Sequence, residues 1–160
     1  WLHTGDMGRI DDDGFLFITD RKKALFKLST GKYVAPQPIE NALGESPFVE
    51  QLIVIGNEKK FCSALIVPNF QGVRSKLKEL SDLNDEHLIR EEPVRELIQE
   101  EIDRINKQFA IWEQVKKFVL LSEPFSIGSG ELTPTLKVKR NEVKKTRKKE
   151  IEEIYPPGDE

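Results

Sequence analysis

The first 41 residues constrain the fold more than any other part of the sequence, because three turn signals and a helix start follow closely on one another. We expect turns at residues 4–6, 11–14 and 29–31, each of which contains a glycine. The runs between these turns are short and rich in strand-forming residues. Pro36 and Pro38 then set up the first turn of a helix. This order predicts short β-hairpins that lead into a helix.

Several short strands are expected on either side of such turns. Residues 15–19 form the second arm of a hairpin, and residues 24–28 and 32–35 flank the turn at Gly31. Two apolar runs further along the chain are joined by a polar turn, which is again a hairpin pattern, and a last strand follows much later. These three strands are expected at residues 49–56, 61–67 and 115–121.

Helical periodicity appears in three places. Ile39, Ala42 and Leu43 give the first helix a buried stripe, and we expect that helix to end near residues 44–47. The stretch from 70 to 109 is mostly helical, and its apolar residues recur at steps of three or four, at Val94, Ile98, Ile102, Ile105 and Phe109. A loop at 123–135 precedes one final helix, expected over 138–154. The order predicts an α+β fold, in which a short hairpin accompanies a small central β-sheet flanked by helices.

Composition excludes several classes of protein. With 160 residues, of which 38% are hydrophobic and 33% charged, the chain can form one compact domain with some excess. A net charge of −3 argues against a general nucleic-acid binder. The single Cys62 excludes an internal disulfide framework, and no apolar run approaches the roughly 20 residues of a membrane span. Because the chain begins with Trp1 inside a motif, we expect it to be part of a longer protein.

Four positions near the N-terminus are candidates for ligand contacts, and each has a plainer interpretation. Asp6 could accept two hydrogen bonds from a vicinal diol such as a ribose, or it could be an ordinary turn aspartate. Arg21 and Lys23 belong to a group of four charged residues between two strands, and charged residues in such a place usually mark only an exposed strand edge. Gly31 could allow a ligand to approach the backbone, or it could be a simple turn glycine. His3 and His87 are too few and too far apart to predict a metal site.

A basic run near the C-terminus also has two interpretations. It could be a solvated helix face balanced by neighbouring glutamates, which is the common case, or it could attract a polyphosphate ligand such as ATP or coenzyme A. The run contains Lys137, Lys139, Arg140, Lys144, Lys145, Arg147, Lys148 and Lys149. Lys137 differs from the others because it lies between a glycine-containing loop and a helix. A lysine in that position can reach into a site on another domain.

Two groups of residues, taken together, resemble the AMP-forming acyl-CoA synthetases, and within them the long-chain fatty acid–CoA ligase branch. The first group is Thr4-Gly5-Asp6, Gly14-Phe15-Leu16, Asp20-Arg21-Lys22-Lys23, LSTGKYVAP at 28–36 and Ile39-Glu40-Asn41, and the second is LTPTLKVKR at 132–140. The resemblance covers nearly the whole chain. It implies a large N-terminal domain that ends at residues 1–19, a hinge at residues 20–23 and a mobile C-terminal α+β domain at residues 24–160.

The resemblance also implies roles for the candidate residues. Asp6 would bind the ribose hydroxyls of ATP and acyl-AMP, and Arg21 would contact the nucleotide near the ribose and phosphate. Lys23 would be the pivot, and Lys137 would be the lysine of the adenylation step. Gly31 would leave room for the pantetheine arm of coenzyme A in the second half-reaction. One departure stands out: many relatives outside the long-chain branch have Ser-Gly-Lys where this chain has Thr135-Leu136-Lys137, which places the lysine in a stiffer setting.

The implied activity is that of a long-chain fatty acid–CoA ligase, in the cytosol or at a membrane periphery. The expected partners are a long-chain fatty acid, ATP with Mg²⁺ bound mainly through its phosphates, coenzyme A and the N-terminal domain of the same chain, with no nucleic acid. The C-terminal part alone is expected to be inactive. Two alternatives stay open at this point: a fatty acyl-AMP ligase that loads a carrier protein, and a non-catalytic interaction module.

Overall fold

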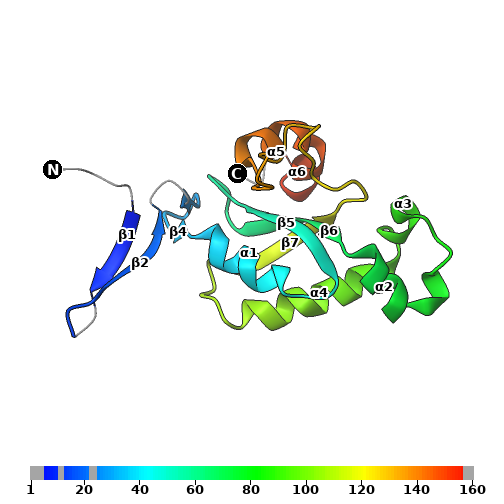
Figure 1. The fold of residues 1–160 in the computed structure, drawn as a ribbon, viewed down its shortest axis with the longest axis horizontal. Helices are drawn as coiled ribbons and strands as arrows, with labels where there is room; N and C mark the ends of the chain where they lie inside the picture. The colour runs from blue at the N-terminus through cyan, green and yellow to red at the C-terminus, as the bar shows by residue number, and fades with distance from the viewer. Residues whose placement is uncertain (1–5, 11–12, 22–24, 157–160) are drawn as a thin grey trace.

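The computed structural model describes residues 6–10, 13–21 and 25–156. The first described unit is an antiparallel hairpin of β1 (Asp6–Ile10) and β2 (Leu16–Arg21), which lies at one end of the molecule (Figure 1). Its register pairs Asp6 with Arg21 and shifts once, between Met7 and Gly8. The predicted hairpin is confirmed.

A second, smaller hairpin follows and leads directly into the first helix. β3 (Phe26–Lys27) pairs with β4 (Tyr33–Val34), and the Gly31 amide closes the turn by donating to the Leu28 carbonyl at 2.9 Å. Gly31 has a φ of +88°, a left-handed conformation that favours glycine, as the sequence predicted. Two residues after the end of β4, α1 (Pro36–Gly44) begins with proline in its first turn and buries Ile39 and Leu43.

The centre of the molecule is a three-stranded sheet in the order β5-β6-β7. β5 (Val49–Ile55) pairs antiparallel with β6 (Cys62–Pro68), and β6 pairs parallel with β7 (Val115–Leu120). The parallel connection needs a long crossover. It is formed by α2 (Phe70–Lys76), the 3₁₀ helix η2 (Lys78–Leu80), α3 (Asp85–Leu88) and α4 (Glu92–Asn106).

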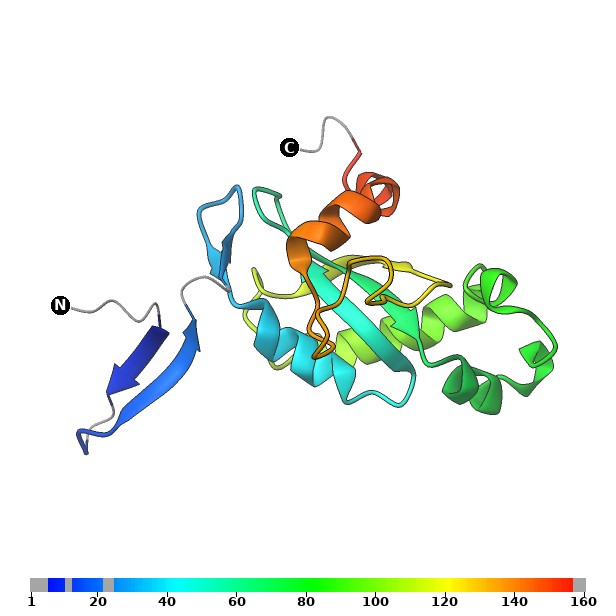
Figure 2. The ribbon, with the colours of Figure 1, turned by 45° about the horizontal axis from the view of Figure 1, so that its top comes forward.

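Helices cover both faces of this sheet, and the middle strand is buried throughout (Figures 1 and 2). Because successive strand residues point to opposite faces, Ala64 and Ile66 pack against the α1 and α4 side, whereas Leu65 and Val67 pack against the C-terminal helices. Val94, Ile98, Ile102 and Ile105 of the predicted stripe are buried in the first of these layers, whereas Phe109 lies beyond the end of α4 and is partly buried. The α+β class and the central sheet flanked by helices are therefore confirmed.

The prediction of one final helix over 138–154 is wrong. The structure has two short helices, α5 (Arg140–Thr146) and α6 (Lys148–Ile154), separated at Arg147. Arg147 has a φ of −105° and a ψ of 30°, outside the helical region, and its side chain is held by hydrogen bonds to a buried carboxylate. The bend allows Val143 on α5 and Ile154 on α6 to be buried against the same face of the sheet.

Candidate functional site

Lys137 lies on a small hairpin loop that precedes α5. We call residues 132–138 the lysine hairpin, since Leu132 and Val138 form an antiparallel bridge at its base. At its tip the Leu136 amide donates to the Thr133 carbonyl, and the Thr133 amide donates to the Lys137 carbonyl, both at 2.8 Å. This is the bonding pattern of a three-residue hairpin loop whose last position takes a left-handed conformation. The side chains of Leu136 and Lys137 are both exposed.

The left-handed position of this loop is occupied by Leu136, which has a φ of +63°. A residue with a Cβ atom is strained in that conformation by about 1–2 kcal/mol, whereas glycine is not. The hydroxyl of Thr133 further restricts the loop, because it accepts a hydrogen bond from the Lys137 amide at 3.0 Å. These contacts are consistent with the expectation that the loop carrying the lysine is more rigid than one with glycine before the lysine.

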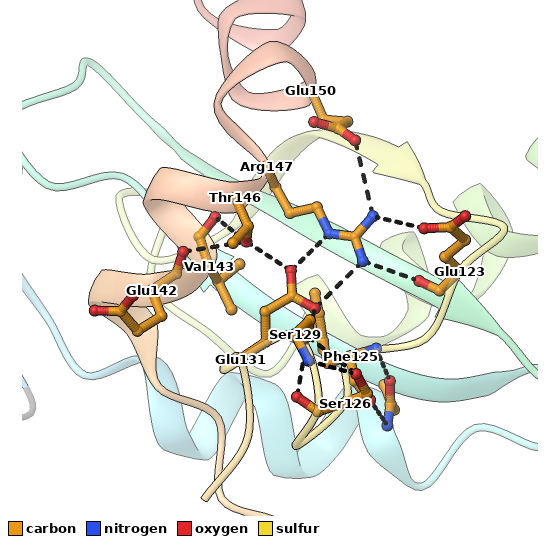
Figure 3. Close-up of polar contacts among 11 residues, drawn as sticks. Glu123, Phe125, Ser126, Ser129, Glu131, Glu142, Val143, Thr146, Arg147 and Glu150 are labelled. Atoms are coloured by element: carbon orange, nitrogen blue, oxygen red, sulfur yellow. Dashed lines mark hydrogen bonds and ion pairs between the residues drawn. The ribbon is translucent and has the colours of Figure 1, made fainter.

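A buried carboxylate anchors the lysine hairpin at its N-terminal side (Figure 3). Glu131 is 1% exposed, and its carboxylate accepts hydrogen bonds from Ser129 Oγ at 2.8 Å, Thr146 Oγ1 at 2.6 Å and Arg147 Nε at 2.8 Å. Its backbone carbonyl accepts from the Lys139 amide at 2.7 Å. Glu131 therefore connects both arms of the hairpin to the bend between α5 and α6.

Electrostatics favour the charged form of this anchor. Burial raises the pKa of Glu131, but the hydrogen bonds from Arg147, Thr146 and Ser129 outweigh burial and hold the pKa below its ordinary value of 4.5. Burial lowers the pKa of Arg147, and the bond to Glu131 reverses that effect and raises it. The pair stays ionised at neutral pH, so the anchor is intact under physiological conditions.

A second carboxylate anchors the hairpin at its C-terminal side. The Arg140 guanidinium holds both oxygens of Glu40 on α1, at 2.7 and 2.6 Å, and Arg140 Nη1 donates to the Val54 carbonyl at 2.9 Å. Glu40 Oε1 in turn accepts from the Val54 amide at 2.7 Å. Burial raises the pKa of Glu40, and Arg140 opposes that rise. The ion pair thus satisfies both backbone groups of Val54 on β5, as a neighbouring strand would.

A groove of about 720 Å³ runs between the lysine hairpin and α1. Lys137 and Leu136 line one wall, and Gln37 and Asn41 on α1 line the other. Gly31 is not among the residues lining this groove, and in Figure 2 the β3–β4 hairpin projects beyond the N-terminal end of α1, apart from the orange loop that precedes α5. A methyl group at Gly31 would meet no described atom within 4 Å. The part of the chain that the structure describes therefore presents Lys137 and Gly31 at separate places.

The remaining predicted site residues are only partly described. The register of the first hairpin places Asp6 opposite Arg21 on adjacent strands, which are about 5 Å apart. The backbone therefore brings together the two residues expected to contact a nucleotide. Lys23, the expected pivot, lies outside the described residues.

The basic run turns out to have mixed roles. Arg140 and Arg147 are the two anchors described above, and Lys145 and Lys148 form ion pairs with Glu142 and Glu152, respectively. For these four residues the structural interpretation accounts for the charge. Attraction of a polyphosphate by the other lysines stays a prediction.

Comparison with known proteins decides the family. The family described as AMP-binding enzyme C-terminal domain matches residues 23–158. The chain belongs to this family. Among curated relatives, long-chain-fatty-acid–CoA ligase 5 of Mus musculus is 40% identical over 159 residues. That alignment covers 97% of this chain but only 23% of the relative, so the chain spans less than a quarter of the relative's length.

Solved structures that contain adenylation domains have the same fold. The adenylation domain of a carboxylate reductase from Mycobacterium chelonae aligns with a TM-score of 0.75 and 28% identity, over 95% of this chain and 22% of that one. The A-PCP didomain of a carboxylic acid reductase from Segniliparus rugosus, in complex with AMP, aligns with a TM-score of 0.65 and 26% identity, over 95% of this chain and 20% of that one. The α+β architecture of the described residues is thus that of the C-terminal part of adenylate-forming enzymes.

Sequence reasoning did not assign a role to Glu40 or to Glu131. Glu40 belongs to the Ile39-Glu40-Asn41 motif, and Glu131 directly precedes the second motif. Both are acidic residues close to a motif, yet their arginine partners are separated from them by 100 and 16 positions. The available signal was an acidic residue next to a motif, and this signal does not identify the arginine with which the carboxylate pairs.

Proposed function

We propose that this chain is the C-terminal domain, with its hinge, of a long-chain fatty acid–CoA ligase. The complete enzyme would join a fatty acid to ATP, forming acyl-AMP and pyrophosphate, and would then transfer the acyl group to coenzyme A. The similarity to long-chain-fatty-acid–CoA ligase 5 supports this substrate class. The observation that carries the proposal is the position of Lys137, exposed on a hairpin that two ion pairs anchor to the rest of the domain.

The chemistry requires a cation of this kind in the first half-reaction. A fatty carboxylate attacks the α-phosphate of ATP, so two anions must come into contact. An ammonium group between the carboxylate and the phosphate offsets their repulsion and aligns the attack. Removal of one preorganised charge of this type typically costs about 10²–10³-fold in rate. We assign this role to Lys137.

The other predicted residues complete the proposed site. Asp6 would hold the ribose and Arg21 would contact the nucleotide, and the register that pairs them supports a shared ligand. Lys23 would be the pivot between residues 1–19 and the mobile domain, and the family match beginning at residue 23 is consistent with a boundary there. After rotation about this hinge, Gly31 would replace Lys137 in the site and leave room for pantetheine.

The ligands follow from this scheme. ATP and coenzyme A are the expected co-substrates, and Mg²⁺ would be held mainly by the phosphates of ATP. Among the described residues no group of three or more His, Cys, Asp or Glu side chains is placed to hold a metal ion.

In the same part of the chain, no helix has the length and apolar character needed to cross a bilayer. Peripheral contact with a membrane stays a prediction.

Two half-reaction assays on the full-length enzyme test the proposal. The Lys137→Ala variant should lose ATP–pyrophosphate exchange by at least about 10²-fold and should still form acyl-CoA from supplied acyl-AMP. Lys148→Ala is the matched control, since it removes the same charge from another exposed lysine, which pairs with Glu152, and it should leave both reactions near wild type. Unchanged exchange in Lys137→Ala would reject the assignment and favour a non-catalytic interaction module.

A second candidate function is a fatty acyl-AMP ligase that loads a carrier protein. The structural similarity to an A-PCP didomain supports it, because that protein combines an adenylation domain with a PCP domain. Both enzymes would form the same acyl-AMP, so the exchange assay cannot separate them. Competition between coenzyme A and a carrier protein for the acyl-AMP formed by the full-length enzyme does.

A further inference from the structure

We propose that Leu136 is a positioning residue for Lys137, and that its side chain packs against the large N-terminal domain when the enzyme adopts the pose for adenylation. This inference rests on the proposed function. It adds an apolar contact that sets how far the lysine reaches into the active site. The partner surface is the preceding part of the same protein, which accounts for most of the length of relatives such as the Mus musculus ligase.

The first observation is the backbone strain at Leu136. Its φ of +63° lies in the left-handed region, which a γ-branched side chain rarely adopts. Glycine would fill the last position of this hairpin loop without strain. A leucine here therefore makes the isolated domain less stable than a glycine would. We infer that the leucine side chain contributes a contact in the complete enzyme, where another domain is present.

The second observation is the exposure of the side chain. Leu136 is 68% exposed, next to an exposed lysine, at the tip of the lysine hairpin. It lines the rim of the groove opposite Gln37 and Asn41, whose polar side chains bond to one another at 2.8 Å. Leu52 and Val138 also line the groove, yet most of the Leu136 side chain stays exposed. The side chain is thus available to a separate apolar surface.

The anchors at both ends of the hairpin make such a contact effective. Glu131 and Glu40 fix the two arms of the hairpin through ion pairs, and the tip that they hold leaves Leu136 exposed. An apolar surface that accepts Leu136 would therefore fix the position of the whole tip. Lys137 is the next residue along the chain, so the same contact would fix where its ammonium group lies. A displacement of about 1 Å at the reacting atoms is enough to cost about 10²-fold in rate.

Substitutions at Leu136 in the full-length enzyme separate this role from a structural one. Leu136→Gly removes both the strain and the side chain, and Leu136→Asn removes the apolar contact with a residue that tolerates the left-handed conformation. For both we expect ATP–pyrophosphate exchange to fall by about tenfold or more, mainly in kcat. Acyl-CoA formation from supplied acyl-AMP should stay within about twofold of wild type. Leu136→Met should keep most of the exchange activity, because it retains an apolar side chain of similar volume.

A control and a stability measurement complete the test. Ile127→Asn changes another apolar residue, 51% exposed in the loop before Glu131, and should leave both half-reactions unchanged. The midpoint of thermal unfolding of the 160-residue chain should be unchanged or higher in Leu136→Gly, because the strain is released. A lower midpoint, or equal losses in both half-reactions, would overturn the positioning role. Normal exchange in Leu136→Gly and Leu136→Asn, beside an inactive Lys137→Ala, would overturn this inference alone and leave the proposed function intact.

Discussion

Replacement of Glu131 by glutamine tests whether the anchor of the lysine hairpin is a strong interaction. The substitution keeps the size of the side chain and removes its charge. Glu131 is 1% exposed, and its two oxygens accept bonds from Ser129, Thr146 and Arg147. In the variant, the amide NH₂ must face hydrogen-bond donors, and the Arg147 guanidinium loses its charged partner.

The expected loss can be built from these contacts. A hydrogen bond to a charged acceptor contributes about 1.5–3 kcal/mol, against about 0.5–1.5 kcal/mol for a neutral one, so weakening the Arg147 bonds costs about 1–2 kcal/mol. One buried donor that faces the new NH₂ group costs about 1–2 kcal/mol more. We therefore expect Glu131→Gln to lower the free energy of unfolding by about 3 kcal/mol, which lies at the lower end of the values for breaking a buried ion pair.

Glu123→Gln is the matched control. Glu123 faces the same guanidinium, with Oε2 at 3.9 Å from Arg147 Nη1, but its side chain is 81% exposed. Exposed pairs contribute little, so this variant should lose less than about 1 kcal/mol. Urea unfolding of the 160-residue chain, followed by circular dichroism, measures both variants. Equal losses for Glu123→Gln and Glu131→Gln would refute the argument that burial makes the second contact strong.

The pH dependence of the same pair gives an independent readout. The pKa of Glu131 is lowered in the folded chain, so its contribution to stability is present above its ordinary pKa of 4.5 and is lost as the pH falls through the folded value. The difference in stability between wild type and Glu131→Gln should be constant near neutral pH and should shrink below pH 4.5. A difference that grows on acidification would contradict the assigned sign.

Three further predictions concern the other anchor, the buried thiol and the turn glycine. Arg140→Ala leaves the Glu40 carboxylate buried without its partner and should lower the free energy of unfolding in urea by about 3 kcal/mol. Arg104→Ala, which removes a side chain that is 56% exposed, should leave the urea unfolding curve nearly unchanged. Burial raises the pKa of the Cys62 thiol from 9.0 to about 12. Iodoacetamide at pH 8 should therefore alkylate the native chain at least about a thousandfold more slowly than the unfolded chain. Comparable rates would show that the thiol is accessible. Gly31→Ala should lower the free energy of unfolding by about 1 kcal/mol through its φ of +88° alone, and no measurable loss would mean that the turn takes another conformation.

Local signals predicted most of the fold. Glycine turns, apolar periodicity and prolines placed both N-terminal hairpins, α1, α4 and the three strands of the sheet within a few residues of their observed bounds. The bend at Arg147 could not be predicted in this way. Neither glycine nor proline marks it, and its cause is a hydrogen bond to Glu131, 16 positions earlier. A tertiary contact overrides helix propensity there.

The candidate site was predictable in its motifs but not in its supports. Lys137 and Gly31 were singled out by their place beside loops, and the structure gives both an exposed position on a hairpin. The contact between Glu40 and Arg140 spans 100 residues, and the backbone groups that it satisfies belong to a third element, β5. Periodicity and spacing carry no information about such a contact, because it depends on how α1, β5 and α5 pack.

These supports bear on how the lysine would leave the site between the two half-reactions. Withdrawal by a motion of the loop alone would require both anchors to open, because each arm of the lysine hairpin is tied to a different part of the domain. With about 3 kcal/mol for each ion pair, such a state would be populated at roughly one part in 10⁴. Rotation of the whole domain about residues 20–23 breaks neither pair. If Lys137 serves the adenylation step, the anchors therefore favour rotation of the domain over opening of the loop.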